Sequence, residues 1–127
     1  MDAASAVARP IEIEARDLCY VRGTRVIMDR LSCVFPRGRI SVLAGPSGSG
    51  KTTLLRMIAC LIQPDRGAIR IDGEADVAQM GAGALRAFRR RVGMLFQGGA
   101  LLDSMSVFVN VALPLRENTR MPEAEIR

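Results

Sequence analysis

The residues G-P-S-G-S-G-K-T, at positions 45–52, constrain the fold of this chain more than any other feature. They match the pattern G-x-x-x-x-G-K-[ST] in full. A nearly continuous apolar run at residues 40–44 precedes them, and an amphipathic pattern at residues 52–62 follows. Such a run is typical of a buried parallel strand, and such a pattern is typical of a helix. We therefore predict a strand, a glycine-rich loop and a helix in direct succession.

Each residue type in this loop suits the binding of phosphate. The glycines let successive backbone N–H groups point inward, and the N-terminus of the following helix adds positive charge beneath an anion. Lys51 can reach between two phosphates, and the Thr52 hydroxyl can bind Mg²⁺. A plain Gly/Ser connector is the alternative, but the flanking strand and helix patterns favour a phosphate loop.

The composition narrows the chemistry that the chain can perform. It has no histidine, which excludes His-ligated metal sites and imidazole bases. Lys51 is the single lysine among 18 basic residues. The net charge of +5 comes from scattered arginines, and the aromatic fraction of 4% offers little surface for stacking on bases. We therefore predict no nucleic-acid partner. The three cysteines lack a C-x-x-C spacing and are predicted to be reduced thiols.

Turn signals divide the rest of the chain into short elements of one α/β domain. Strands are predicted at residues 11–21, 26–28, 31–35, 40–44, 68–71 and 92–96. Helices are predicted at residues 52–62, 84–91 and 107–113, the last ending before Pro114, with a further helix opening at residues 121–123. Residues 1–10 are predicted to be a flexible leader, and residues 11–127 the domain. The arginines of the second helix are interpreted as a solvated face.

The stretch before the loop distinguishes two families that share the motif. Guanylate-kinase-like enzymes have a similar loop close to the N-terminus, after one strand, whereas 44 residues precede Gly45 here. These residues resemble the nucleotide-binding subunit of ABC transporters, in which a small antiparallel sheet precedes the loop. Other stretches that resemble this subunit are residues 17–20, 36–38, 64–73 and 92–97. Within that family, the chain most resembles the ATPase subunit of the Mla (toluene-tolerance) systems, at residues 97–102, 107–110 and 113–117. The Mla systems move phospholipid between the membranes of Gram-negative bacteria.

The resemblance implies roles for individual residues. Tyr20 would stack on adenine, although it could be an ordinary half-buried strand residue. Gln97 would help to bind Mg²⁺ with Thr52 and report to the membrane partner, although it could be a polar strand end. The phosphates of ATP would be bound by Gly45, Pro46, Ser47, Gly48, Ser49, Gly50, Lys51, Thr52 and Thr53. The apolar residues 98–102 could be core or could dock against the permease.

The chain also departs from the family pattern. It has no L-S-G-G-Q-like signature, no apolar run ending in Asp-Glu after Gln97 and no switch histidine. Asp72 follows an apolar strand, but Gly73 stands where a catalytic Glu would be, so we interpret Asp72 as a turn residue. We expect an antiparallel β subdomain and the start of a parallel core sheet, truncated before the helical subdomain. We also expect no ATP hydrolysis by this chain alone, and poor solubility from exposed sheet edges.

The resemblance implies an ATP-binding subunit of an ABC transporter that couples ATP binding and hydrolysis to transport, here of phospholipid. Its cofactors would be ATP and Mg²⁺. Its partners would be a transmembrane permease and a second nucleotide-binding subunit, at the cytoplasmic face of the inner membrane. Two alternatives stay open: a soluble ABC-type nucleotide-binding module without a transport role, and a nonfunctional gene fragment.

Overall fold

The structure, a computed structural model, describes residues 12–73 and 76–127. The chain divides into two compact units, one ending at Val92 and the other comprising Gly93–Arg127. The leader predicted at residues 1–10 lies outside the described residues. The domain predicted over residues 11–127 stays a prediction.

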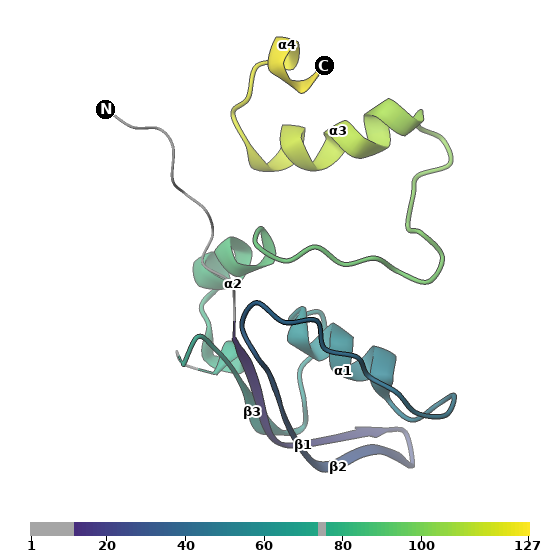
Figure 1. The fold of residues 1–127 in the computed structure, drawn as a ribbon, viewed down its shortest axis with the longest axis vertical. Helices are drawn as coiled ribbons and strands as arrows, with labels where there is room; N and C mark the ends of the chain where they lie inside the picture. The colour runs from purple at the N-terminus through teal and green to yellow at the C-terminus, as the bar shows by residue number, and fades with distance from the viewer. Residues whose placement is uncertain (1–11, 74–75) are drawn as a thin grey trace. The chain divides into compact units, whose positions relative to one another are not determined.

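One antiparallel sheet forms the base of the first unit (Figure 1). Strands β1 (Ile13–Arg22), β2 (Arg25–Phe35) and β3 (Arg66–Ile71) lie in the order β2-β1-β3, and both neighbours of β1 run antiparallel to it. A two-residue turn joins β1 to β2, and its first residue, Gly23, has φ 63°, a conformation that glycine adopts without strain. The predicted antiparallel sheet before the loop is therefore confirmed.

Strand β2 is continuous, whereas the sequence predicted two strands at residues 26–28 and 31–35. Pairing continues because the register shifts three times. Strand β1 gains one residue between Ala15 and Leu18, and β2 gains one between Met28 and Leu31 and another between Val26 and Met28. The first two of these irregularities each contain a residue with positive φ, Asp17 on β1 and Arg30 on β2. Asp29 and Arg30, which separate the two predicted strands, thus lie within the single strand β2.

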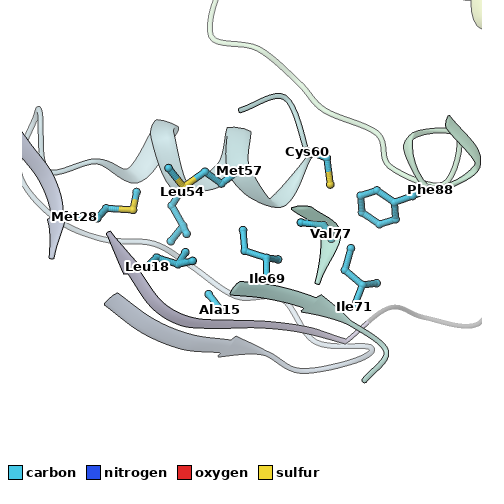
Figure 2. Packing of buried hydrophobic residues seen from close by; sticks show 10 residues of the cluster. All are labelled: Ala15, Leu18, Met28, Leu54, Met57, Cys60, Ile69, Ile71, Val77 and Phe88. Carbon is cyan, nitrogen blue, oxygen red and sulfur yellow. The ribbon is translucent and has the colours of Figure 1, made fainter. Parts of the chain in front are cut away.

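Helix α1 (Lys51–Ile58) lies over one face of the sheet and closes the core of the first unit. Figure 2 shows Leu54 and Met57 of α1 directed toward Leu18 of β1 and Ile69 of β3. Leu18, Met57 and Ile69 are fully buried. The buried cluster consists of Ala15, Leu18, Met28, Leu54, Met57, Cys60, Ile69, Ile71, Val77 and Phe88.

The end of α1 differs from the prediction, which extended the helix to residue 62. Cys60 has φ 56°, in the left-handed region. Its N–H donates to the Met57 carbonyl (2.9 Å), and the Leu61 N–H donates to the Arg56 carbonyl (2.8 Å). These two bonds form a Schellman cap, which reverses the chain after Ala59. A cysteine occupies the position usually held by glycine, so the sequence carried no visible stop signal.

Two predicted strands are wrong, namely those at residues 40–44 and 92–96. Neither segment belongs to a strand in the part of the chain that the structure describes. Ile40, Val42 and Leu95 are 96%, 83% and 88% exposed. A parallel strand is stable only with hydrogen-bonded neighbours and covered faces. An apolar run alone cannot supply either of these.

After β3 the first unit continues with two short helices. The short helix η1 (Val77–Gln79) begins at Asp76, whose carboxylate accepts from the N–H groups of Ala78 and Ile69, each at 3.1 Å. Helix α2 (Ala82–Arg89) contributes the buried Phe88. The guanidinium of Arg89 donates to the Cys60 carbonyl at 2.6 Å. The arginine face of α2 is therefore partly used for packing rather than wholly solvated.

The second unit contains helices α3 (Val107–Asn118) and α4 (Glu123–Ile126). The predicted end of α3 before Pro114 is wrong, because the helix continues through this residue. Proline removes one helical N–H, which leaves the carbonyl of residue 110 without its usual partner. Pro114 is exposed, so water can reach the altered turn. Among the described residues, no helix is both long and apolar enough to cross a membrane.

Candidate phosphate-binding site

The predicted loop connects residues 40–44 to the start of α1 and owes its shape to its glycines. Gly48 and Gly50 have φ values of 78° and 92°, in the left-handed region that other residues adopt with strain. Gly50 is also the N-cap of α1. A Cβ at Gly50 would lie 3.1 Å from Cγ2 of Ile27, so the loop sits tightly against β2. Glycine at this position therefore serves both the turn and the close packing.

The N-terminus of α1 is open to an anion. The helix has neither a side-chain cap nor an acidic residue in its first turn. Its first backbone bond runs from the Leu54 N–H to the Gly50 carbonyl (2.9 Å), so the N–H groups of Lys51, Thr52 and Thr53 precede the helical ladder. Unpaired N–H groups and the positive end of the helix dipole together favour bound phosphate.

The side chain of Lys51 folds back over the loop. Its Nζ donates to the carbonyl oxygens of Gly45 (2.8 Å) and Pro46 (2.7 Å) and to Oγ of Ser49 (3.3 Å). The ammonium group is therefore held above the curled backbone, at the position from which it could neutralise a phosphate. The loop also closes on itself through a 3.3 Å bond from the Ser49 N–H to the Pro46 carbonyl.

Two of the cavities formed by the described residues border this loop. One of about 310 Å³ is lined by the loop residues Gly45, Pro46, Ser49, Gly50 and Lys51 and, among others, by Cys33 and Leu54. The other, about 680 Å³, is lined by Lys51 and Thr52. The Thr52 side chain is exposed at the helix start, so its hydroxyl is available to a metal ion bound with phosphate. These residues fit a nucleotide phosphate with Mg²⁺.

Tyr20, the predicted base-stacking residue, lies on β1 opposite Met28 of β2. It is half-buried and packs against the core cluster. It is not among the residues that line the two cavities beside the loop. Its role in stacking on adenine stays a prediction, and its surroundings also suit the alternative of a half-buried strand residue.

Gln97, the second predicted Mg²⁺ ligand, belongs to the second unit and is exposed. It lies with Gly98 at the centre of a turn that the Gly99 N–H closes by donating to the Phe96 carbonyl (2.9 Å), outside any helix or strand. Its part in binding Mg²⁺ with Thr52 stays a prediction. No group of three or more acidic or cysteine ligands forms a metal site within the described ranges.

Asp72 is confirmed as a turn residue. It has φ 54° at the end of β3, and its carboxylate accepts from the Glu12 N–H (2.8 Å) and from Arg37 (2.6 Å). Arg91 lies 3.7 Å from the other carboxylate oxygen. The carboxylate thus joins the start of β1, the turn before the loop and the end of α2.

Sequence reasoning missed one residue that supports the loop. The guanidinium of Arg25, at the start of β2, donates to the carbonyl of Gly48 at 3.3 Å. Arg25 is one of many arginines in the chain and stands 20 positions before Gly45. No local pattern distinguishes it, because its contact arises only when the β1–β2 hairpin lies beside the loop.

Comparison with known proteins identifies the family. The sequence profile of the family described as ABC transporter matches residues 28–126. This chain belongs to that family. The predicted class, a P-loop α/β domain of the ABC type, is confirmed.

Several curated ABC proteins are similar to the chain. The intermembrane phospholipid transport system ATP-binding protein MlaF of Escherichia coli K12 is 50% identical over 110 residues, which is 87% of this chain and 40% of MlaF. MlaF of Haemophilus influenzae is 46% identical over 91% of this chain and 43% of its own length. The probable ribonucleotide transport ATP-binding protein mkl of Mycobacterium tuberculosis H37Rv is 42% identical over 92% of this chain and 32% of mkl. The chain thus spans about 40% of the length of the MlaF proteins that it matches.

Solved structures give the same fold. The dimeric bacterial ABC transporter cassette MJ0796 superposes with a TM-score of 0.80 at 28% identity, covering 90% of this chain and 52% of the cassette. A second structure of that cassette, in a post-hydrolysis state bound to ADP and Pi, has a TM-score of 0.77. The antiparallel sheet and α1 of this chain are therefore arranged as in an ABC cassette.

Proposed function

We propose that this chain binds ATP with Mg²⁺ at residues 45–53 and is part of the ATP-binding subunit of an ABC transporter for phospholipid. The observation that carries the proposal is the loop itself, where an uncapped helix N-terminus, left-handed glycines and the Lys51 ammonium come together. The similarity to MlaF proteins supports the choice of phospholipid as cargo.

Within this function each residue has a separate task. Backbone N–H groups of the loop and of the first turn of α1 bind the phosphate oxygens. Lys51 exchanges its bonds to the loop carbonyls for bonds to phosphate, which are stronger because both partners are charged. Mg²⁺, when bound, neutralises phosphate charge; Thr52 and Gln97 would hold it, and Tyr20 would stack on the base.

The proposed assembly contains a second nucleotide-binding subunit and a transmembrane permease, at the cytoplasmic face of the inner membrane. Support for the dimer comes from the MJ0796 cassette, which is dimeric. The predicted permease contact, residues 98–102, includes Leu101 and Leu102, which are 68% and 44% exposed. Exposure favours a surface role for these leucines over the alternative of a core position.

The first experiment is the binding of the non-hydrolysable ATP analogue AMP-PNP, with Mg²⁺, to the 127-residue chain. Lys51→Ala should weaken binding by about tenfold to a hundredfold, because a charge-assisted bond to phosphate is lost. Arg56→Ala is the matched control, because it removes one positive charge from the exposed face of the same helix. Equal affinity of the Lys51→Ala variant and the unmodified chain would refute the site.

Hydrolysis and transport require a second experiment. We expect no Mg²⁺-dependent ATP turnover from the 127-residue chain, because the sequence contains no signature motif, no Asp-Glu after an apolar run and no histidine. Transport is tested with the complete ATP-binding protein and its permease in vesicles containing a fluorescent phospholipid. Lipid movement that does not depend on Lys51 would exclude the proposed coupling.

A further inference from the structure

Asp65 lies just before β3 and makes two hydrogen bonds to β1, one on each side of Tyr20. Its N–H donates to the carbonyl of Cys19 at 2.9 Å, and its Oδ2 accepts from the N–H of Val21 at 2.7 Å. The pairing of β1 with β3 ends with Cys19 opposite Arg66. A carboxylate oxygen therefore takes the place of a strand carbonyl and continues the ladder past the end of β3.

The backbone around Asp65 is itself held against β1. Gly67 has φ 92°, and a Cβ at this position would lie 2.5 Å from the carbonyl oxygens of Arg16 and Asp17. Only glycine, which has no Cβ, allows two backbone segments to approach so closely. The backbone that carries Asp65 is thus fixed beside the strand that its carboxylate contacts.

The part of β1 that Asp65 contacts lies beside the phosphate loop. Tyr20 pairs with Met28 of β2, and Cε of Met28 lies 3.5 Å from the position that a Cβ on Gly50 would occupy. The edge of β1 that faces away from β2 has no strand neighbour beyond Cys19 in the described chain. Unpaired strand ends fray, because their backbone groups exchange protein partners for water. The two bonds of Asp65 therefore restrain the backbone of Tyr20 beside the loop.

We propose that Asp65 is a positioning residue, which holds the backbone on both sides of Tyr20 so that the tyrosine ring is in place for the adenine base before ATP binds. The proposal rests on the function proposed above and adds to it the residue that orders the base-binding part of the site. Ordering the tyrosine before binding raises the affinity, because the entropy of fixing it has already been lost. Asp65 itself touches neither base nor phosphate in this role.

The bond from the Val21 N–H requires an acceptor at position 65 rather than a charge. Asp65→Ala removes the acceptor, whereas Asp65→Asn keeps a carbonyl oxygen on a side chain of the same shape and loses only the charge. Asp29→Ala is the matched control, because it removes the same charge from an exposed position on β2, next to Met28.

The first test measures the protection of the Val21 amide by hydrogen exchange in the 127-residue chain. Asp65→Ala should lower this protection by about threefold to tenfold, the effect of one hydrogen bond. Asp65→Asn should retain most of it, and Asp29→Ala should leave it unchanged. Unaltered protection of Val21 in the Asp65→Ala variant would overturn the assignment.

The second test uses Tyr20 as its own probe, because the chain contains one tyrosine and no tryptophan. Adenine that stacks on the ring should quench the tyrosine fluorescence when AMP-PNP is added with Mg²⁺, and the titration gives the affinity. Asp65→Ala should weaken AMP-PNP binding by about threefold to tenfold, because the tyrosine must then be ordered on binding.

Inorganic tripolyphosphate, which has no base, separates positioning of the tyrosine from damage to the phosphate loop. Its affinity, measured by calorimetry, should be the same for the Asp65→Ala variant and the unmodified chain. Asp65→Asn should restore the affinity for AMP-PNP, and Asp29→Ala should bind as the unmodified chain does. A purely structural defect would instead weaken the binding of tripolyphosphate as well and would overturn the positioning role.

The outcomes separate this proposal from the proposed function. If the unmodified chain binds neither AMP-PNP nor tripolyphosphate, the nucleotide site fails and the role of Asp65 fails with it. If AMP-PNP binds without a change in tyrosine fluorescence, the phosphate site stands, whereas stacking by Tyr20 and its positioning by Asp65 are both overturned.

Two further results would overturn the positioning role alone. One is quenching by AMP-PNP with the same affinity in the Asp65→Ala variant as in the unmodified chain. The other is an equal loss of affinity in the Asp65→Ala and Asp29→Ala variants, because the effect would then follow charge rather than the bond to Val21.

Discussion

The two units of the chain are stabilised by different interactions. In the first unit, residues from the sheet, from α1 and from the segments after β3 form one buried apolar cluster (Figure 2). In the second unit, whose residues are all described, Ala112 is the one buried side chain. Its helices and turns are tied instead by polar contacts, such as those of Asn110 and the ion pair of Arg116 with Glu123.

This difference indicates how each unit acquires its stability. Burial of apolar surface contributes roughly 25 cal/mol per Å², so a cluster around α1 can order the first unit and with it the phosphate loop. Exposed hydrogen bonds and ion pairs contribute far less, because water competes for the same groups. The second unit therefore has less apolar burial to order it than the first.

The largest expected effect comes from removing a side chain at the centre of the first unit. Met57 is fully buried between α1 and the sheet, and Met57→Ala should lower the free energy of unfolding by about 2–5 kcal/mol. Val111→Ala, on α3, should change it by less than about 0.5 kcal/mol because this valine is 69% exposed. Urea denaturation monitored by circular dichroism measures both changes. Similar losses in the two variants would remove the contrast between the units.

An intermediate effect is expected at the polar cap that joins β3 to η1. Asp76→Ala removes the acceptor for the N–H groups of Ile69 and Ala78 and should cost about 1–2 kcal/mol. Asp103→Ala, an exposed aspartate in a turn of the second unit, is the control and should be nearly neutral. The midpoint of thermal unfolding reports the difference. A neutral Asp76→Ala would mean that the first unit depends on its apolar cluster alone.

The smallest effect is expected at the ion pair of the second unit. Nε of Arg116 donates to Oε2 of Glu123 at 3.0 Å, and this hydrogen bond lowers the pKa of Glu123. Because the pKa is lower in the folded chain, the pair stabilises α4 at neutral pH, and this stabilisation is lost as the pH falls through the folded-state pKa. Glu123→Gln should therefore loosen α4 slightly at pH 7 and make no difference at strongly acidic pH.

NMR amide exchange in α4 measures this effect across the pH range, with Glu117→Gln as the control. Both side chains are partly exposed to solvent, so the effect should shrink as salt is added. An effect of Glu123→Gln that is the same at acidic and neutral pH would show that the charge of Glu123 is unimportant.

Local signals predicted much of the first unit correctly. Alternating residues and a Gly-Thr turn predicted the strand of β1 and the turn after it, and the family resemblance predicted that the sheet is antiparallel. The start of α1 follows directly from the loop motif. The role of Asp72 as a turn residue was also predicted. The contact of Arg25 with Gly48 was not, because residues distant in sequence meet there. The continuation of α3 through Pro114 was missed because proline usually ends a helix.

The sequence by itself determined the phosphate loop, because that loop depends on residue types at fixed short spacings. It indicated the antiparallel sheet and the family through the resemblance of several longer stretches. Tertiary structure alone decided which apolar segments form strands. Residues 68–71 and 40–44 are similarly apolar, yet the former lie in β3 beside β1 and the latter lie in no strand of the described chain. A strand needs a neighbour to bond its backbone, and whether that neighbour is present cannot be read from the segment itself.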